Sequence, residues 1–325
     1  MLIQPWRSTA APFAPASPMG RSGPGDPFGH PAGRGIAPSG GTATGSGPAA
    51  ARSATARPGV ALPPGPMPLR LGSRPLKRWC YVGVYGPDLM LCAGTAHVGP
   101  LGQGFWAMWD RRAGVLESET VLVRTGRVRV TPRDVAVHSG GVRMELAVSP
   151  IGEPVEVVSP HGRSYIWTRK TPVRVHGHAT LGMEVRPISG TGLVDESAGY
   201  HARETAWEWS AGVGTSVDGW PVVWNLVRGV HDAETMSERT VWIHGRPIEA
   251  PPVRFSTDLD EVWGQDGSLL RFEEEASRMR NENLGLIRSD YVQPFGRFQG
   301  TLPGGIELSD HEPALGVMER HRARW

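Results

Sequence analysis

The sequence predicts an all-β protein built as a sandwich or barrel of antiparallel strands. From residue 76 onward, short apolar or alternating runs recur along the chain, and Gly, Pro and Asp residues separate them. The turns follow one another at intervals of roughly 8 to 12 residues, a spacing typical of antiparallel sandwiches and barrels. Only residues 273–283, rich in Glu, Arg, Met and Ala, have a helical composition. We therefore expect two β-rich lobes with one short helix.

The first 66 residues differ in composition from the rest of the chain. They contain 13 of the 30 Pro and 12 of the 43 Gly residues, and they show no aliphatic periodicity. Such a segment cannot bury enough apolar surface to offset its conformational entropy, so we expect a disordered tail over residues 1–66. Because strand-like sequence begins soon after Met67, a further hypothesis is that Met67 is the first residue of the native protein.

The charge of the chain argues against nucleic-acid binding. The tail carries five Arg and one Asp, a net charge of +4, which leaves 29 basic and 31 acidic residues in the remaining 259. A folded part so close to neutrality lacks the basic surface that a phosphate backbone requires. The chain also has no secretory signal pattern and no run of roughly 18 apolar residues. We expect a cytoplasmic protein without a membrane span; its oligomeric state is not predicted.

The N-terminal lobe is expected over residues 67–190. Its first two strands, 76–85 and 89–97, flank a Gly-Pro-Asp turn and should form a hairpin. Cys80 and Cys92 lie one on each of these strands, where they could form a disulfide but are expected as free buried thiols. Later strands of this lobe are expected at 104–109, 115–123, 127–130, 135–138, 142–148, 155–158, 164–170, 173–179 and 183–187.

The Ser- and Gly-rich stretch from Ser189 to Gly192 predicts the boundary to a C-terminal lobe over residues 191–325. Three strongly marked strands, at 201–209, 221–230 and 238–244, open this lobe. Further strands are expected at 253–255, 259–263, 268–272, 291–299, 305–309 and 316–323, with the helix at 273–283 between them.

The opening strands of the C-terminal lobe carry the candidate site. The stretch 198–246 holds five of the chain's twelve Trp residues and mixes them with His, Arg and Asn. Alternate residues of a strand share a face, and we expect one face of 201–209 to line a cavity for a small molecule. That face carries His201, Arg203, Thr205, Trp207 and Trp209.

An inward-facing Arg203 would need an acidic partner, because an unpaired buried charge costs several kcal/mol. Glu238 and Asp232 are the candidates in this region. Burial also shifts the pKa values of imidazole and carboxylate groups, which acid–base catalysis requires, so His201 and Glu238 are predicted as a catalytic pair.

The next strand places Asn225 among apolar residues, where its amide needs either backbone partners or the polar end of a ligand. Strand alternation does not decide whether Trp224 or Asn225 shares a face with Trp207. The predicted ligand-binding residues are Arg203, Trp207, Trp209, Trp224 and Asn225. The alternative is a filled barrel interior, in which Arg203 and a carboxylate form a plug and the Trp rings belong to the core.

Other ionisable residues give weaker signals. His176 and His178 share a face, but no third ligand with matching spacing stands out, so no metal and no cofactor are expected. Glu319 and His321 also share a face and are interpreted as a surface or barrel-mouth pair. The sequence contains no P-loop, no GxSxG elbow and no HExxH motif.

Five segments resemble an uncharacterised bacterial family of unknown function, and the resemblance extends over about residues 78–325. They are GYHARETAWEWSAGVG, VVWNLVRGVHD, ERTVWIHG, YVQPFGRFQGTL and the closing ERHRARW. That family in turn resembles the lipocalin-like superfamily that includes the carotenoid 1,2-hydratases (hydroxyneurosporene synthases) and fungal Diels–Alderase-like cyclases. The resemblance implies two β-rich, lipocalin-like lobes with a hydrophobic pocket, and it supplies no catalytic residues for this chain.

The function expected from these observations is binding of an apolar or amphipathic small molecule, such as a lipid or isoprenoid, in a Trp-lined cavity. Whether the chain also catalyses hydration, isomerisation or cyclisation stays open. The alternatives are a ligand-binding protein without catalysis and a structural β protein with a filled interior.

Overall fold

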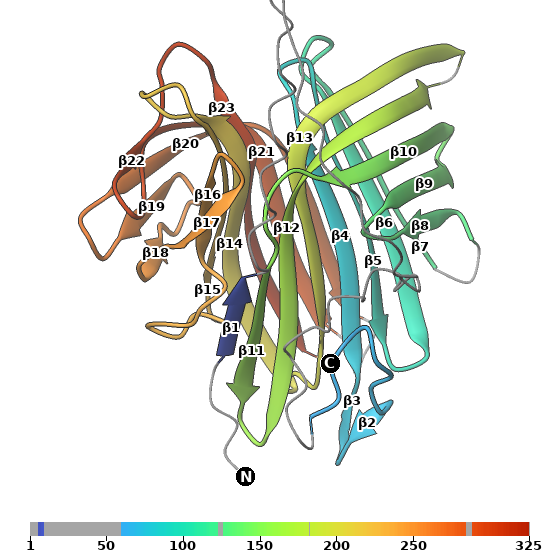
Figure 1. Cartoon of the computed structure of the whole chain (residues 1–325). Helices are drawn as coiled ribbons and strands as arrows, with labels where there is room; N and C mark the ends of the chain where they lie inside the picture. Colours follow the sequence, from blue (N-terminus) through green and yellow to red (C-terminus); the bar gives the residue numbers. More distant parts are fainter. Residues whose placement is uncertain (1–5, 10–59, 123–125, 182, 284–287, 325) are drawn as a thin grey trace, which may run out of the picture. The chain divides into compact units, whose positions relative to one another are not determined.

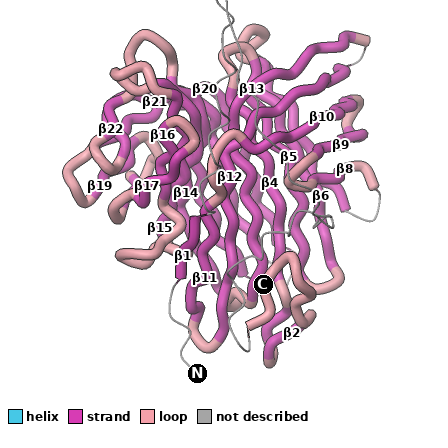
Figure 2. The backbone as a smooth tube through the Cα atoms, viewed as in Figure 1, coloured by secondary structure: helices cyan, strands magenta, loops and turns pink. Residues whose placement is uncertain are grey.

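The computed structural model describes residues 6–9, 60–122, 126–181, 183–283 and 288–324. Within these ranges the chain forms strands and loops and contains no helix, as Figure 2 shows. Accordingly, none of the described segments is a helix long and apolar enough to cross a membrane. The strands form two large antiparallel sheets and one small hairpin, β2 (Arg70–Leu71) with β3 (Arg74–Pro75). The predicted all-β class is confirmed.

The first sheet has 11 strands, and its main path runs in the order β7-β6-β5-β4-β13-β12-β10-β9-β8, with β11 paired to β12 and β1 paired to β11 (Figure 1). The long strand β12 pairs with β11 along its first part and with β10 along its second. The strands are β1 (Trp6–Thr9), β4 (Lys77–Tyr85), β5 (Leu89–Val98), β6 (Leu101–Asp110), β7 (Val115–Leu122), β8 (Val128–Val130), β9 (Asp134–Ser139), β10 (Val142–Pro150), β11 (Val155–His161), β12 (Ser164–Leu181) and β13 (Glu184–Gly199).

The second sheet has 10 strands, in the order β17-β16-β15-β14-β23-β21-β20-β19-β18, with β22 paired to β21. Its last strand in sequence, β23, lies between β14 and β21, so the C-terminal strand is central. The strands are β14 (Glu204–Thr215), β15 (Pro221–Arg228), β16 (Thr240–Ile243), β17 (Arg246–Glu249), β18 (Val253–Phe255), β19 (Glu261–Gly264), β20 (Leu269–Asn283), β21 (Arg288–Leu302), β22 (Ile306–Glu307) and β23 (Ala314–Arg324).

Buried apolar side chains form three clusters. One belongs to the first sheet and contains Trp106, and another belongs to the second sheet and contains Trp224. The remaining cluster combines residues of both sheets, among them Tyr81 and Trp209, whose rings meet edge to face at 5.5 Å. The two sheets therefore pack against each other through this shared cluster. The candidate site lies on the faces that contribute to it.

The helix predicted at 273–283 is wrong, because these residues belong to β20. This strand pairs with β21 along its length, with a bulge between Glu274 and Ala276. The segment is rich in good helix formers, but such propensities amount to only some tenths of a kcal/mol per residue. Pairing with β21 along the whole segment and burial of Arg278 against the first sheet outweigh that local preference.

The boundary predicted at residue 190 lies inside β13 rather than in a linker. At Gly192, a Cβ atom would lie only 1.8 Å from the carbonyl oxygen of Gly83 in β4. Glycine is needed there because the two paired strands approach each other closely. Composition alone cannot distinguish such a glycine from one in a linker. The chain passes from the first sheet to the second between Gly199 and Glu204.

The tail predicted as disordered contributes one strand. Residues Trp6–Thr9 form β1, which pairs antiparallel with β11. An edge strand presents unpaired backbone groups that a neighbouring segment of suitable extended sequence can satisfy. Residues 1–5 and 10–59 of the predicted tail lie outside the described residues.

Cys80 and Cys92 lie on the neighbouring strands β4 and β5, as predicted, and both are free thiols. They face opposite sides of the sheet: Cys80 packs against the first sheet's own cluster, whereas Cys92 belongs to the shared cluster.

Candidate functional site

Strand β14 presents Trp207 and Trp209 on the face that looks toward the first sheet. The indole nitrogen of Trp209 donates a hydrogen bond of 2.7 Å to Asn225 Oδ1, and Asn225 Nδ2 donates to the backbone oxygen of Glu238 at 2.9 Å. Trp207 stacks on Trp79 of β4 at a centroid distance of 6.1 Å. Asn225 is therefore the member of its strand that shares a face with the two Trp residues.

Two predicted ligand-binding residues lie elsewhere. Arg203 is exposed to solvent, so the expectation that it faces inward and pairs with Glu238 is wrong. Strand β14 begins only at Glu204, and alternation does not extend to the loop residue before it. Trp224 lies on the opposite face of the second sheet, where its indole nitrogen donates to Ser210 Oγ and its ring packs on Phe298.

The acidic residue Glu238 has a different cation as its partner. Lys170 of β12 lies between two carboxyl groups, with its Nζ 2.6 Å from Asp195 Oδ1 and 3.3 Å from Glu238 Oε1. The side chains of Lys170 and Glu238 are each only 3% exposed. We call these three residues the ion triad. It joins both sheets, because Lys170 and Asp195 belong to the first and Glu238 precedes β16 of the second.

Three histidines interact with one another next to the ion triad, and we call His161, His201 and His231 the histidine cluster; of these, His231 is the one on which the charges of Lys170 and Asp195 act. The His201 ring lies 5.8 Å from that of His161 and 5.1 Å from Trp79. His231 Nδ1 shares a hydrogen bond of 2.8 Å with Ser159 Oγ.

Several buried polar atoms here have no hydrogen-bond partner of normal geometry among the described residues. They are both ring nitrogens of His201, Nε2 of His161, Nε2 of His231, Oε2 of Glu238 and Oδ1 of Asp195. Two of these side chains have a partner nearby, because Asp195 Oδ1 contacts the ammonium of Lys170 and a hydrogen bond with the backbone of Gly199 raises the pKa of His201. Buried polar groups in native proteins are nearly always hydrogen-bonded to protein, ligand or water, and an unmade bond costs about 1–3 kcal/mol. This group of atoms in one neighbourhood is the strongest indication of a binding site in the described chain.

Burial controls the protonation of this region. Desolvation, together with the charge of Lys77, lowers the pKa of His201 well below its usual value, so its ring is neutral. Desolvation, reinforced by Lys170, lowers the pKa of His231 to about 3. Burial would also lower the pKa of Lys170, but the charges of Asp195 and Glu238 outweigh it and raise that pKa, which keeps the ammonium charged.

A second polar group lies on the same face of the second sheet, around Glu319 of β23. Glu319 Oε1 accepts a hydrogen bond from Trp207 Nε1 at 2.8 Å, and Oε2 accepts from Tyr291 and Gln293 at 3.0 Å. Burial raises the pKa of Glu319 to about 7, although these hydrogen bonds oppose the shift. The interpretation of Glu319 and His321 as a surface or barrel-mouth pair is wrong for Glu319, which is 8% exposed.

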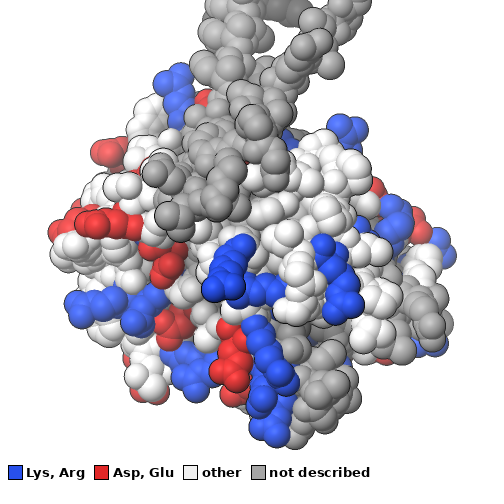
Figure 3. Space-filling model, turned by 90° about the horizontal axis from the view of Figure 1, so that it is seen from below, with Lys and Arg blue, Asp and Glu red and all other residues white. Residues whose placement is uncertain are grey.

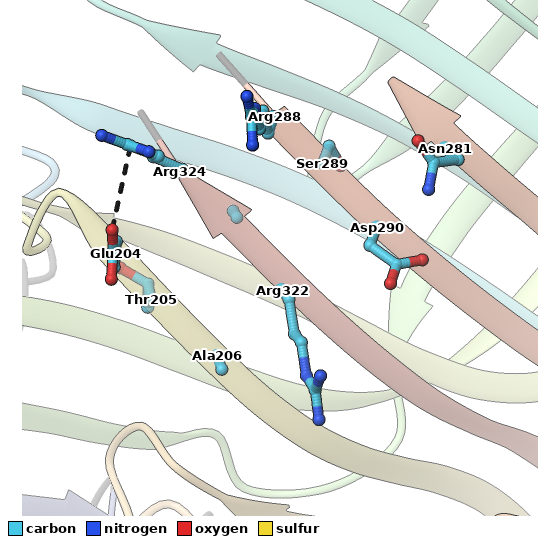
Figure 4. Close-up of a pocket in the computed structure, with 10 residues that line it drawn as sticks. Glu204, Thr205, Ala206, Asn281, Arg288, Ser289, Asp290, Arg322 and Arg324 are labelled. Carbon is cyan, nitrogen blue, oxygen red and sulfur yellow. Dashed lines mark ion pairs between the residues drawn. The ribbon is translucent and has the colours of Figure 1, made fainter. Parts of the chain in front are cut away.

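Two pockets open on the surface, and neither is lined by Trp207, Trp209 or Trp224. One, of about 580 Å³, lies at the ends of β14, β20, β21 and β23 and is lined mostly by charged and small polar side chains (Figure 4). Its Glu204 and Arg324 form an ion pair of 3.8 Å. The other, of about 500 Å³, lies between residues 63–69 and the strands β4, β5, β12 and β13. The predicted Trp residues are instead packed in the interior.

Exposed charges of both signs are interspersed. Figure 3 shows acidic and basic side chains next to one another on the face that it draws. His178 lies 4.0 Å from Glu145, and His176 shares a hydrogen bond with Ser189, so each of these exposed histidines has its own partner. No group of three or more potential metal ligands occurs among the described residues.

The sequence analysis identified His201, Glu238, Trp207, Trp209 and Asn225, which the structure brings together, but it missed the residues from the first sheet. Lys170 and Asp195 are directly opposite each other in the β12–β13 ladder. The signal available in the sequence was a charged residue at an inward position of a largely apolar strand, such as Asp195 after Leu193 and Val194. His161 and His231 gave no such signal, because His161 lies at the end of β11 and His231 lies in a loop.

Comparison with solved structures finds several similar chains. A putative AttH from Nitrosomonas europaea has a TM-score of 0.44 and 14% sequence identity, over 82% of this chain and 98% of that one. Kievitone hydratase from Nectria haematococca has a TM-score of 0.41 and 9% identity, over 77% and 88%. CghA with Sch210972 has a TM-score of 0.39 and 8% identity, over 76% and 87%. No curated protein matches the chain.

A family model described as a domain of unknown function, DUF2804, matches residues 127–325. The match covers more than half of the chain, from the strands around β8 to the C-terminal residue, and it includes all of the second sheet. The protein therefore belongs to the DUF2804 family.

Proposed function

We propose that this protein binds a small amphipathic molecule between its two sheets, with the polar end of the molecule at the histidine cluster. The observation that carries the proposal is the group of buried polar atoms that make no hydrogen bond of normal geometry among the described residues. A bound polar group would supply the hydrogen bonds that the protein itself leaves unmade. The aromatic rings of Trp79, Trp207 and Trp209 next to this group suit an apolar body.

Proton transfer at the polar end is the chemistry that these residues favour. His201 is neutral and can accept a proton, and the buried Oε2 of Glu238 can accept a hydrogen bond. This pair would serve hydration, isomerisation or cyclisation, reactions that begin or end with a proton moved to or from the substrate. A ligand-binding role without catalysis uses the same contacts.

The substitution His201→Phe tests the binding proposal. It keeps an aromatic ring against Trp79 but removes both nitrogens, so it removes the cost of two buried atoms that make no hydrogen bond of normal geometry. If the nitrogens serve a ligand, the variant should gain about 1–3 kcal/mol of unfolding free energy without ligand and lose the ligand. Native mass spectrometry of the full chain, followed by denaturing mass spectrometry, measures whether a small molecule leaves on unfolding.

His138→Phe is the control, because His138 is exposed on β9. The proposal is contradicted if native and denatured masses of the unsubstituted protein agree and a panel of lipids and isoprenoids adds no mass to it.

A structural role is the second candidate function, because some of the buried polar groups pair with one another. The ion triad pairs Lys170 with two carboxyl groups, and Trp209 and Asn225 hydrogen-bond each other. Under this role His201→Phe would still stabilise the protein, but no small molecule would be found in the unsubstituted one. The mass measurement therefore separates the two candidates.

A further inference from the structure

Four segments of the chain meet at one end of the first sheet. The starts of β4 and β6 and the ends of β5 and β13 lie in one row of the ladder, where Lys77 is paired with both Gly199 and Val98. The hairpin β2–β3 lies beside the turn between β11 and β12, because Arg74 donates to the backbone oxygen of His161 at 2.8 Å. We call this end of the sheet the basic end (Figure 1). Its segments are residues 61–78, 95–103, 159–166 and 198–203.

The charges of the basic end have one sign. Its segments contain no Asp or Glu, and four of their arginines are exposed: Arg70, Arg78, Arg163 and Arg203. Lys77 adds little to the surface, because it is 2% exposed and because burial and the charge of Arg74 lower its pKa to about 7. Of the acidic residues next to these segments in the sequence, Glu156 and Glu204 are each paired with an arginine, and Glu196 is half-buried. Figure 3 views the molecule from this end, and most of the acidic side chains in that view lie toward the left.

Large apolar side chains are exposed among these arginines. Leu69, Leu71 and Leu101 are 70%, 39% and 64% exposed. They lie near one another, because backbone hydrogen bonds link Leu69 to Leu76 and Leu76 to Gly99, in the turn that leads into β6. Single exposed apolar side chains are common on protein surfaces, whereas a group of them marks a contact with another molecule or with a membrane.

A pocket of about 500 Å³ opens beside these side chains. Its lining includes Leu69 and the exposed Arg78, and Glu196 is the one acidic residue in it. Most of the other lining residues are apolar, among them Met67 and Trp167. A hollow with apolar walls and an arginine in its lining can take part of a lipid chain while the lipid head group stays among the arginines.

We propose that the basic end of the first sheet docks on the surface of a membrane that contains anionic lipids. The exposed arginines lie among the lipid head groups, and Leu69, Leu71 and Leu101 enter the layer of acyl chains next to them. Basic residues alone would suit any polyanion, and exposed leucines alone would suit any apolar partner. The two together are typical of peripheral contact with anionic lipid. This inference does not depend on the proposed function, which concerns the space between the two sheets.

Flotation of the full chain with lipid vesicles tests the proposal. Vesicles of phosphatidylcholine alone are compared with vesicles in which about one lipid in three is phosphatidylglycerol. The protein should float with the anionic vesicles at low salt, and the bound fraction should fall as added salt screens the arginines. Equal binding to both kinds of vesicle overturns the proposal. Absence of binding to the anionic vesicles also overturns it, and leaves a protein as the partner of the exposed leucines.

Substitution of the exposed leucines tests whether this surface makes the contact. Leu69→Ser and Leu101→Ser should each weaken binding to anionic vesicles at least about threefold, because less apolar surface enters the bilayer. Met279→Ser is the matched control and should bind like the unsubstituted chain, since Met279 is 75% exposed but lies on β20 of the second sheet. Unchanged binding of both leucine variants, or an equal loss in Met279→Ser, overturns the assignment of this surface.

The arginines are tested by the double variant Arg70→Gln, Arg78→Gln. It should lose at least about tenfold in affinity for the anionic vesicles at low salt, and its binding should depend less on salt. The control is Arg246→Gln, Arg254→Gln, which removes the same charge from exposed positions of the second sheet. Equal losses in the two double variants would mean that net charge alone drives binding, which overturns the assigned surface.

Discussion

His231 is held neutral inside the protein, and this has a consequence for stability at acid pH. Its pKa is about 3 in the folded chain against an ordinary value of 6.5, because burial and the nearby Lys170 disfavour the charged ring. Between these pH values the unfolded chain binds a proton that the folded chain does not, so stability falls as pH falls from 6.5 toward 3. Each pKa unit corresponds to about 1.4 kcal/mol, so the loss should reach a few kcal/mol.

Urea unfolding of His231→Gln across this pH range measures the effect. The variant should lose much less stability on acidification than the unsubstituted chain, whereas His138→Gln, at an exposed position, should follow the unsubstituted chain. Parallel curves for the unsubstituted chain and His231→Gln would contradict the assignment.

Glu319 should give folding stability the opposite dependence on pH. Burial raises its pKa from 4.5 to about 7, so between these values the folded chain binds a proton that the unfolded chain releases. Its contribution to stability is therefore fully present below pH 4.5 and is lost as pH rises through 7. The variant Glu319→Gln stays neutral, and its unfolding free energy should not decline in this range.

Chemical unfolding at a series of pH values between 4.5 and 8 reveals this difference, with Glu307→Gln on the exposed strand β22 as the control. A decline in Glu319→Gln as steep as in the unsubstituted chain would show that another group is responsible. The two residues act in opposite directions with slopes of equal size, so their sum should be nearly flat between pH 4.5 and 6.5 and should fall on either side of that range.

Local alternation predicted some of the site residues and not others. Trp207 and Trp209 lie within one regular strand, so period two correctly placed them on one face. Arg203 precedes that strand, and the rule does not apply to it. Lys170 and Asp195 reach the site because the two sheets pack against each other. A local sequence pattern does not reveal which distant strand will lie next to Glu238.

At the scale of elements, close pairing of β13 with β4 depends on glycine. A Cβ at Gly192 would lie 1.8 Å from the backbone oxygen of Gly83, which cannot move without breaking the ladder. The substitution Gly192→Ala should therefore cost more than about 2 kcal/mol of unfolding free energy. Thermal or urea unfolding of the purified variant measures it.

Gly190→Ala on the same strand is the matched control. Its Cβ would meet only a side-chain methyl of Val84, at 2.7 Å, and a side chain can adjust more readily than a backbone. A cost for Gly192→Ala no greater than that for Gly190→Ala would mean that β13 and β4 separate easily. In that case the stretch would behave as the linker that its composition suggested.

The strands were easier to predict than their limits. Alternating runs bounded by turn residues identified most strands of both sheets, because that signal is local. The helical composition of 273–283 and the linker-like composition of 189–192 misled for one reason. Both describe how a segment behaves in isolation, whereas residues 273–283 pair with β21 and β13 pairs with β12 and β4.

At the scale of the whole molecule, the ion triad is a buried charged link between the two sheets. Lys170→Met removes the only cation of the triad and leaves Asp195 and Glu238 as two neighbouring buried carboxyl groups. Breaking a buried pair in this way typically costs about 3–5 kcal/mol. The variant should unfold at correspondingly lower urea concentration.

The triple variant Lys170→Met, Asp195→Asn, Glu238→Gln distinguishes a lost link from uncompensated charge. If the cost of Lys170→Met comes from two carboxyl groups left without a counter-ion, neutralising both should recover most of the lost stability, because the effects of residues in contact are not additive. Urea unfolding of the single and triple variants compares them directly. Should the triple variant be as unstable as Lys170→Met alone, the triad would hold the sheets together by its own attraction. Recovery of stability would instead mean that the cost of burying the charges offsets their attraction, so that the triad adds little to the stability of the fold.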